Sequence, residues 1–115
     1  MQTEIAFKIL SPSEWGAFEC AGRFDGGPVD IAEGFIHMST AEQLDRTLHK
    51  HYRGNDDLYI TIVNLESLGD QVRWEMSKSG QLYPHLYGSL PLKAIIGHGP
   101  LERNTDGTLR LPPTD

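Results

Sequence analysis

Hydrophobic and polar positions alternate in several short stretches of the chain, and each such stretch predicts a β-strand. Residues 4–10 form the first stretch, with Ile5, Phe7 and Ile9 on one face. Residues 58–63 are apolar on both faces, as in a strand at the centre of a sheet. Further strands are predicted at residues 35–38, 71–76, 92–97, 101–103 and 108–111, the last two joined by a turn.

Two segments carry the signals of helix starts. Ser11-Pro12-Ser13-Glu14 has the serine and glutamate of a capping box, with proline at the first helical position. The short helix that follows turns Trp15 and Phe18 inward. Ser39-Thr40-Ala41-Glu42 is interpreted as a second capping box, whose helix runs to about Tyr52. Its apolar positions recur at helical spacing: Ala41, Leu44, Leu48 and Tyr52.

Two stretches rich in glycine and proline predict loops. Residues 22–34 are expected to connect the first helix to the next strand. Residues 77–91 also contain aromatic side chains, a composition that is typical of a binding loop. The chain is therefore expected to form an α+β fold with two helices and about six mostly antiparallel strands. Its length of 115 residues favours a single domain over residues 1–115.

The composition of the chain limits the classes of partner that it can bind. The chain has 10 Lys and Arg against 16 Asp and Glu, a net charge of −6. That balance argues against duplex nucleic acid, which requires clustered basic residues. No long apolar run predicts a membrane span, and the N-terminus does not resemble a signal peptide. A single cysteine cannot form an internal disulfide, which together with these features favours the cytoplasm. The expected partner is a small molecule or nucleotide, with a protein partner as the alternative.

His37 is the first candidate for a catalytic or ligand-binding residue. It ends a predicted strand and lies two residues before Ser39, where the next helix is expected to begin. Free amides at a helix start bind phosphate or carboxylate, and an imidazole beside them can act as a general base. The alternative is that His37 packs under the sheet and Ser39 only caps the helix. No metal site is predicted, because His49 and His51 point to different sides of their helix.

His85 and Glu75 are the second and third candidates. His85 lies in Tyr83-Pro84-His85-Leu86-Tyr87-Gly88, where two tyrosines offer flat surfaces for a heterocycle. The alternative is a loop attached to the body of the protein by its aromatic rings. Glu75 shares a strand face with Arg73, so its carboxylate could orient a ribose hydroxyl; the alternative is a solvated surface ion pair.

Three separated motifs give the chain a family resemblance. They are Gly34-Phe35-Ile36-His37-Met38-Ser39-Thr40 with Gln43 after it, Trp74-Glu75, and residues 83–88. In this order they resemble a small bacterial family known as domain of unknown function 952. The resemblance covers nearly the whole chain, from residues 7–9 to residues 111–112.

The resemblance implies a fold similar to that of ADP-ribosyltransferases, a split antiparallel sandwich whose cleft holds NAD in active relatives. The residues around His37 are also similar to a strand of the RNA 2′-phosphotransferases. Lys8 stands near the point where active relatives carry an Arg or His that grips NAD. By this resemblance His37, Ser39 and Thr40 would bind phosphate or ribose, and Tyr83 and Tyr87 would hold a ring. Glu75 or His85 would contribute from across the cleft, with Glu75 stabilising oxocarbenium-like charge on the ribose. The expected function is an NAD- or ADP-ribose-binding cleft that serves an ADP-ribosyl or phosphoryl transferase. The alternative is a non-catalytic module that binds a metabolite or docks a partner protein through residues 81–88.

Overall fold

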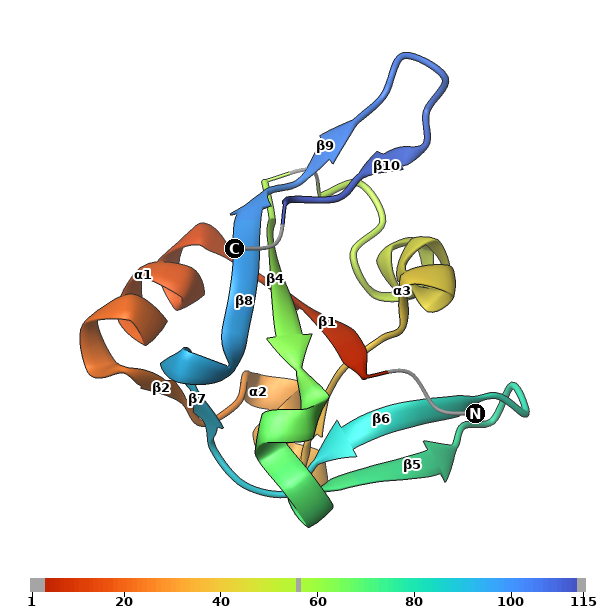
Figure 1. Ribbon diagram of the computed structural model, residues 1–115. Coiled ribbons are helices and arrows are strands. Elements are labelled where there is room, and N and C mark those ends of the chain that lie inside the picture. Colours follow the sequence, from red (N-terminus) through yellow and green to blue (C-terminus); the bar gives the residue numbers. More distant parts are fainter. Residues whose placement is uncertain (1–3, 56, 114–115) are drawn as a thin grey trace.

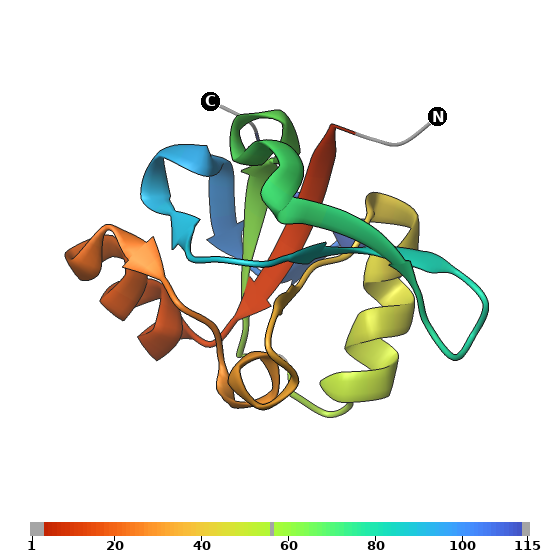
Figure 2. The same ribbon diagram turned by 90° about the horizontal axis from the view of Figure 1, so that it is seen from below.

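The computed structural model describes residues 4–55 and 57–113. Two three-stranded antiparallel sheets form the framework (Figure 1). The first has the order β1–β4–β8, with strands Ile5–Leu10, Tyr59–Asn64 and Ile95–Pro100. The second has the order β3–β6–β5, with strands Ile36–His37, Leu82–Leu86 and Val72–Met76. The β5–β6 hairpin runs across the strands of the first sheet rather than along them (Figures 1 and 2).

Helices and short strands complete the mixed α+β architecture. The α-helices are α1 (Pro12–Ala21), α2 (Pro28–Glu33) and α3 (Leu44–His51). The short strands pair as β2 (Arg23–Phe24) with β7 (Leu90–Pro91), and β9 (Glu102–Arg103) with β10 (Leu109–Arg110). Three 3₁₀ turns are η1 (Ala41–Gln43), η2 (Leu65–Gln71) and η3 (Leu92–Ala94). The α+β class and the antiparallel pairing are confirmed, whereas the expected number of helices is wrong, since the described residues form three.

The first sheet is covered on both faces. Phe7 and Ile9 of β1 pack with Leu44 of α3, on the face that also buries two isoleucines of β4. On the opposite face, Ala6 and Leu10 join α1 and the second sheet in a larger core cluster. Figure 2 shows α1 and α3 on opposite sides of these strands. Because each large apolar side chain stabilises the fold by about 1.5–3 kcal/mol when buried, the two clusters hold the sheets and helices together.

The first predicted helix is confirmed in detail. Ser11 Oγ accepts a hydrogen bond from the Glu14 amide at 3.1 Å, and Glu14 Oε1 accepts one from the Ser11 amide at 2.9 Å. Trp15 and Phe18 are buried against the sheet. The helix ends at Gly22, whose φ of 79° lets its amide reach the Phe18 carbonyl at 2.8 Å. The capping box therefore acts as the sequence predicts.

The expectation of a loop at residues 22–34 is wrong, because this segment contains β2 and α2. Pro28 is the first residue of α2, and Asp30 caps the helix by accepting a hydrogen bond from the Gly27 amide at 2.8 Å. Gly34, with a φ of 90°, ends it. Two of the four glycines that predicted a loop, Gly27 and Gly34, thus flank a short helix.

The expectation of a loop at residues 77–91 is also wrong, because β6 and β7 lie within it. Leu82, Pro84 and Leu86 occupy one face of β6, where Pro84 and Leu86 are fully buried. Proline is normally confined to edge strands because it lacks an N–H donor. Here β6 lies between β3 and β5, and the Pro84 carbonyl still accepts a hydrogen bond from the Met38 amide at 3.2 Å.

Two predicted boundaries shift. The second cap is at Thr40, not Ser39: the Thr40 amide donates to Gln43 Oε1 at 3.0 Å, and a 3₁₀ turn precedes α3. The predicted strand at residues 92–97 begins at Ile95, because residues 92–94 form η3. The hairpin at the C-terminal end is confirmed as β9 and β10.

Candidate functional site

One face of the β3–β6–β5 sheet gathers the candidate residues. Cross-strand pairing places His37 of β3 opposite His85 of β6, and His85 opposite Arg73 of β5. Glu75 lies opposite Tyr83 one step along the same pair of strands. Because paired residues and their second neighbours share a face of an antiparallel sheet, these side chains project to the same side. The other face of the sheet packs into the core.

Glu75 holds the ring of His85. Glu75 Oε1 lies 2.8 Å from His85 Nδ1 and accepts a second hydrogen bond from the Tyr87 hydroxyl at 2.7 Å. The hydrogen bond from Tyr87 lowers the pKa of Glu75 most, and the hydrogen bond from His85 lowers it further. The hydrogen bond between Tyr87 and Glu75 also raises the pKa of Tyr87. With Nδ1 donating to a carboxylate, the neutral ring keeps its lone pair on Nε2. That nitrogen has no hydrogen-bond partner among the described residues, so it is available to a ligand.

His37 is held between two carboxylates. Its Nδ1 lies 2.7 Å from Asp30 Oδ1, and its Nε2 lies 3.1 Å from Glu33 Oε1. Both contacts are hydrogen bonds only when both ring nitrogens carry a proton, so the arrangement favours the imidazolium cation. The hydrogen bond to Asp30 raises the pKa of His37 against the opposing effect of burial. His37 therefore has a carboxylate at each ring nitrogen, whereas His85 has one at Nδ1 only.

Asp30 organises the positive groups beneath this face. Its carboxylate accepts from Lys8 Nζ at 3.0 Å, from the Gly27 amide at 2.8 Å and from the His37 amide at 3.0 Å. Lys8 Nζ also donates to the His37 carbonyl at 2.9 Å. Burial would raise the pKa of Asp30, but the hydrogen bond from His37 and the charge of Lys8 outweigh it, so the pKa lies below its usual value. A buried ion pair thus fixes both the backbone and the ring of His37.

Aromatic rings lie beside the two histidines. Phe35 stacks on His85 with the ring centres 4.1 Å apart, and its ring centre is 4.6 Å from that of His37. His37 and His85 approach edge to face at 5.5 Å. Tyr87 lies 5.3 Å from Phe35, and the Arg73 guanidinium lies 5.2 Å above the Tyr87 ring. The face therefore combines flat apolar surfaces with two cations and the carboxylate of Glu75, which together can bind a ring, a hydroxyl or an anion.

A family model described as "Protein of unknown function (DUF952)" matches residues 9–98. The chain belongs to this family. The chain is also similar to protein CC0527 from Caulobacter crescentus, whose crystal structure is 40% identical in sequence and superposes with a TM-score of 0.83, covering 93% of this chain and 94% of that one. The solution NMR structure of CC0527 has a TM-score of 0.78 at 40% identity and covers 91% and 90% of the two chains. No curated protein matches the chain.

Four of the residues expected at the site of this DUF952 protein come together: His37, His85, Glu75 and Tyr87. The half-buried Tyr83 joins them on the sheet face by its register opposite Glu75. The structure therefore brings together residues from three separate motifs, of which the one around His37 is far from the other two in the sequence.

Three expected ligand-binding residues lie away from this group. The Lys8 ammonium is buried on Asp30, so it does not extend to a ligand at the surface. Ser39 is buried with its hydroxyl 2.8 Å from that of Thr47, and Thr40 uses its amide to cap η1. These contacts occupy the Lys8 ammonium, the Ser39 hydroxyl and the Thr40 amide.

Asp30, Glu33 and Phe35 are members of the site that the sequence analysis missed. All three fall in or next to the segment that was expected to be a loop. A proline followed two positions later by an acidic residue, as in Pro28 and Asp30, is a helix-start signal. It could have placed Asp30 in a first helical turn. Phe35 could have been found from the alternation that puts it on the same side as His37.

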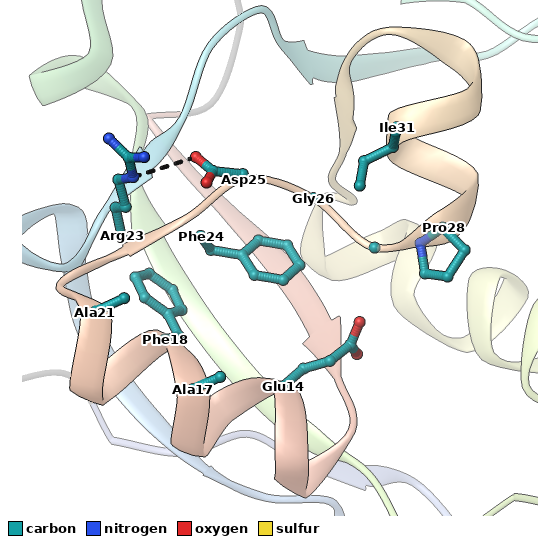
Figure 3. Close-up of a pocket in the computed structure, with 11 residues that line it drawn as sticks. Glu14, Ala17, Phe18, Ala21, Arg23, Phe24, Asp25, Gly26, Pro28 and Ile31 are labelled. Atoms are coloured by element: carbon teal, nitrogen blue, oxygen red, sulfur yellow. Dashed lines mark ion pairs between the residues drawn. The ribbon is translucent and has the colours of Figure 1, made fainter.

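The hollow drawn in Figure 3 lies elsewhere, between α1, β2 and the start of α2. It has a volume of about 350 Å³, and its wall includes the rings of Phe18 and Phe24 and the carboxylate of Glu14 (Figure 3). It contains none of the expected site residues. Within residues 4–55 and 57–113, no group of three or more His, Cys, Asp and Glu side chains is arranged to hold a metal ion. No helix of that described part is long and apolar enough to span a bilayer.

Proposed function

We propose that the sheet face around His37 and His85 binds a nucleotide of the NAD or ADP-ribose type. On this proposal the fold is related to that of the ADP-ribosyltransferases, and His85 with Glu75 transfers a proton during ADP-ribosyl or phosphoryl transfer. The proposal rests on one observation above all. His37 has both ring nitrogens on carboxylates, whereas His85, with its ring centre 5.5 Å away, has one nitrogen on Glu75 and one without a partner among the described residues. Neighbouring titratable groups in unlike environments are typical of acid–base sites.

Each part of such a ligand finds suitable groups on this face. Phe35 and the exposed ring of Tyr87 offer flat surfaces on which a base or a nicotinamide ring can stack. The Arg73 guanidinium, which the structure leaves without a carboxylate contact among the described residues, can bind a phosphate. Glu75 can accept hydrogen bonds from ribose hydroxyls and stabilise positive charge on the sugar, because its carboxylate is 39% exposed.

The proton transfer follows from the geometry of His85. In ADP-ribosyl transfer from NAD, the bond between the ribose carbon and nicotinamide breaks, and nicotinamide leaves with the bonding electrons. An acceptor hydroxyl forms the new bond to that carbon and releases its proton. Nε2 of His85 takes this proton, while Glu75 holds Nδ1 and stabilises the imidazolium that forms. The proposed step does not use the Lys8 ammonium, the Ser39 hydroxyl or the Thr40 amide, since each is hydrogen-bonded within the protein.

Amide NMR titration with NAD, ADP-ribose and nicotinamide tests the proposal. Saturable shifts at residues 35–37, 73–75 and 85–87 are expected, and they should be lost in His85→Gln. The matched control is His98→Gln, because His98 is exposed on β8 and its Nδ1 lies 2.9 Å from the Tyr59 hydroxyl, away from the sheet face. The absence of saturable shifts at millimolar ligand, or equal losses in both variants, would overturn the nucleotide site and leave a partner-docking or other metabolite-binding module.

Turnover is measured separately as release of nicotinamide from NAD. Glu75→Gln should abolish release while NAD still binds, because the amide keeps the shape of the side chain but cannot stabilise an imidazolium. Release at the native rate in that variant would remove Glu75 from the mechanism. Binding without any release would support the non-catalytic alternative on the same site.

A further inference from the structure

A second hollow, of about 570 Å³, lies between α3 and the β9–β10 hairpin. In the view of Figure 1, α3 stands between this hairpin and the β5–β6 hairpin that carries His85 and Glu75. None of the residues that line the hollow belongs to the sheet face described above. We name it the arginine cleft after three of its lining residues, Arg46, Arg53 and Arg103.

The arginine cleft is positive although the chain as a whole is negative. Three arginines line it against a single acidic residue, Asp45, which gives the cleft two positive charges in excess. The complete chain carries a net charge of −6. A local positive field in an acidic protein directs small anions to one place on its surface.

The guanidinium groups keep most of their donors free. Arg46 has no hydrogen bond or ion pair to any described residue. Arg53 donates to His49 Nε2 at 2.6 Å and makes no ion pair within the described part of the chain. Arg103 lies 3.5 Å from Asp45 and donates to the Gly107 carbonyl at 3.0 Å, which holds it at the edge of the cleft. Two of the three arginines can therefore turn their N–H groups to a ligand.

The floor of the cleft is apolar. Leu48 is 4% exposed and belongs to the core cluster beneath α3, and the partly buried Tyr52 and Leu101 pack against that cluster. The volume of the cleft lies within the range of about 300–1,000 Å³ that is typical of small-molecule sites. Positive groups at the rim and apolar groups at the floor suit a ligand with one charged end and one carbon-rich end.

We propose that the arginine cleft binds a phosphorylated small molecule. The phosphate lies between the guanidinium groups of Arg46 and Arg53, which present pairs of N–H donors that match phosphate oxygens. The carbon-rich part of the ligand lies on Leu48, Tyr52 and Leu101. This site is independent of the nucleotide site proposed for the sheet face, and neither requires the other.

The test is an NMR titration of the full chain with sodium pyrophosphate at constant ionic strength. The signals followed are the backbone amides of residues 45–53 and 101–103 and the Nε–H groups of the arginines. Saturable shifts are expected there in the native protein. In the double variant Arg46→Gln/Arg53→Gln the dissociation constant should rise about tenfold or more, since two charge-assisted contacts are lost.

The matched control is Lys78→Gln/Lys93→Gln, which removes the same charge from two exposed positions outside the cleft. This control should bind pyrophosphate as the native chain does. Adenosine monophosphate should bind more tightly than inorganic phosphate, because only the nucleotide covers the apolar floor. Shifts that do not saturate, that persist in the arginine double variant, or that fall equally in the lysine control would overturn the proposal. Such a result would identify the three arginines as ordinary solvated surface side chains.

Discussion

Replacing Asp30 by asparagine should strongly destabilise the protein. The substitution keeps the shape of the side chain but removes its charge, so the buried Lys8 ammonium is left with neutral acceptors only, the asparagine amide oxygen and the His37 carbonyl. The Lys8 and Asp30 side chains are only 9% and 6% exposed, so water cannot replace the lost carboxylate. Removing one partner of a buried ion pair costs about 3–5 kcal/mol. That loss is a large part of the roughly 5–15 kcal/mol that stabilises an ordinary domain.

Urea unfolding followed by circular dichroism measures this loss as a fall in the free energy of unfolding. The control is Asp25→Asn, because Asp25 and Arg23 form an exposed pair 3.5 Å apart whose removal should cost about 0–1 kcal/mol. Adding Lys8→Met to Asp30→Asn should recover part of the stability, since no buried charge is then left without a partner. A loss below about 1 kcal/mol for Asp30→Asn, or no recovery in the double variant, would refute this account of the ion pair.

The Asp30 carboxylate also makes the stability of the protein depend on pH. The pKa of Asp30 lies below its usual value in the folded protein. Its contribution to stability is therefore fully present above the unfolded pKa of about 3.9 and is lost as the pH falls toward the folded pKa. The acid limb of the stability curve should be shallower in Asp30→Asn than in the native chain. Equal slopes for the two proteins below that pH would contradict the assignment.

Further predictions concern the ring of His37, the carboxylate of Glu75 and the cap of α1. Histidine NMR should give His37 a pKa above the ordinary 6.5, and its stabilising effect should be lost as the pH rises through that pKa; an unraised pKa would count against the contact with Asp30. Tyr87→Phe should raise the pKa of Glu75, measured by carboxyl ¹³C NMR, because it removes the first cause of its lowering, and an unchanged pKa would contradict the hydrogen bond. Ser11→Ala should lower the free energy of unfolding by about 1 kcal/mol in urea, and a neutral effect would show that the capping box contributes little.

Where local chemistry dictates structure, the sequence predicts it well. The capping box at Ser11 and the turn at residues 104–107 are read from adjacent residues, and both occur as expected. The alternation over residues 71–76 also predicted that Arg73 and Glu75 share a face, which the register of β5 against β6 bears out. These features depend on few long-range contacts.

The two wrong loops show where this reasoning fails. Pro84 lies in a strand between two neighbours because the tertiary structure supplies both partners and buries its ring, and no local rule anticipates that. Asp30 was missed because its importance comes from Lys8, which is 22 residues away in the sequence. The candidate site could therefore be predicted as a set of separate residues, but not as two carboxylate–histidine pairs that meet on one sheet.

The central claim is that His37 has a carboxylate at both ring nitrogens whereas His85 has one at Nδ1 alone, and long-range ¹H–¹⁵N NMR of the imidazole rings tests it directly. At a pH of about 6.5, the ordinary histidine pKa, both nitrogens of His37 should be predominantly protonated. Neutral His85 should carry its proton on Nδ1, and adding ADP-ribose should shift the Nε2 signal of His85. A neutral His37 at that pH, or a His85 ring protonated on Nε2 alone, would contradict the acid–base pair.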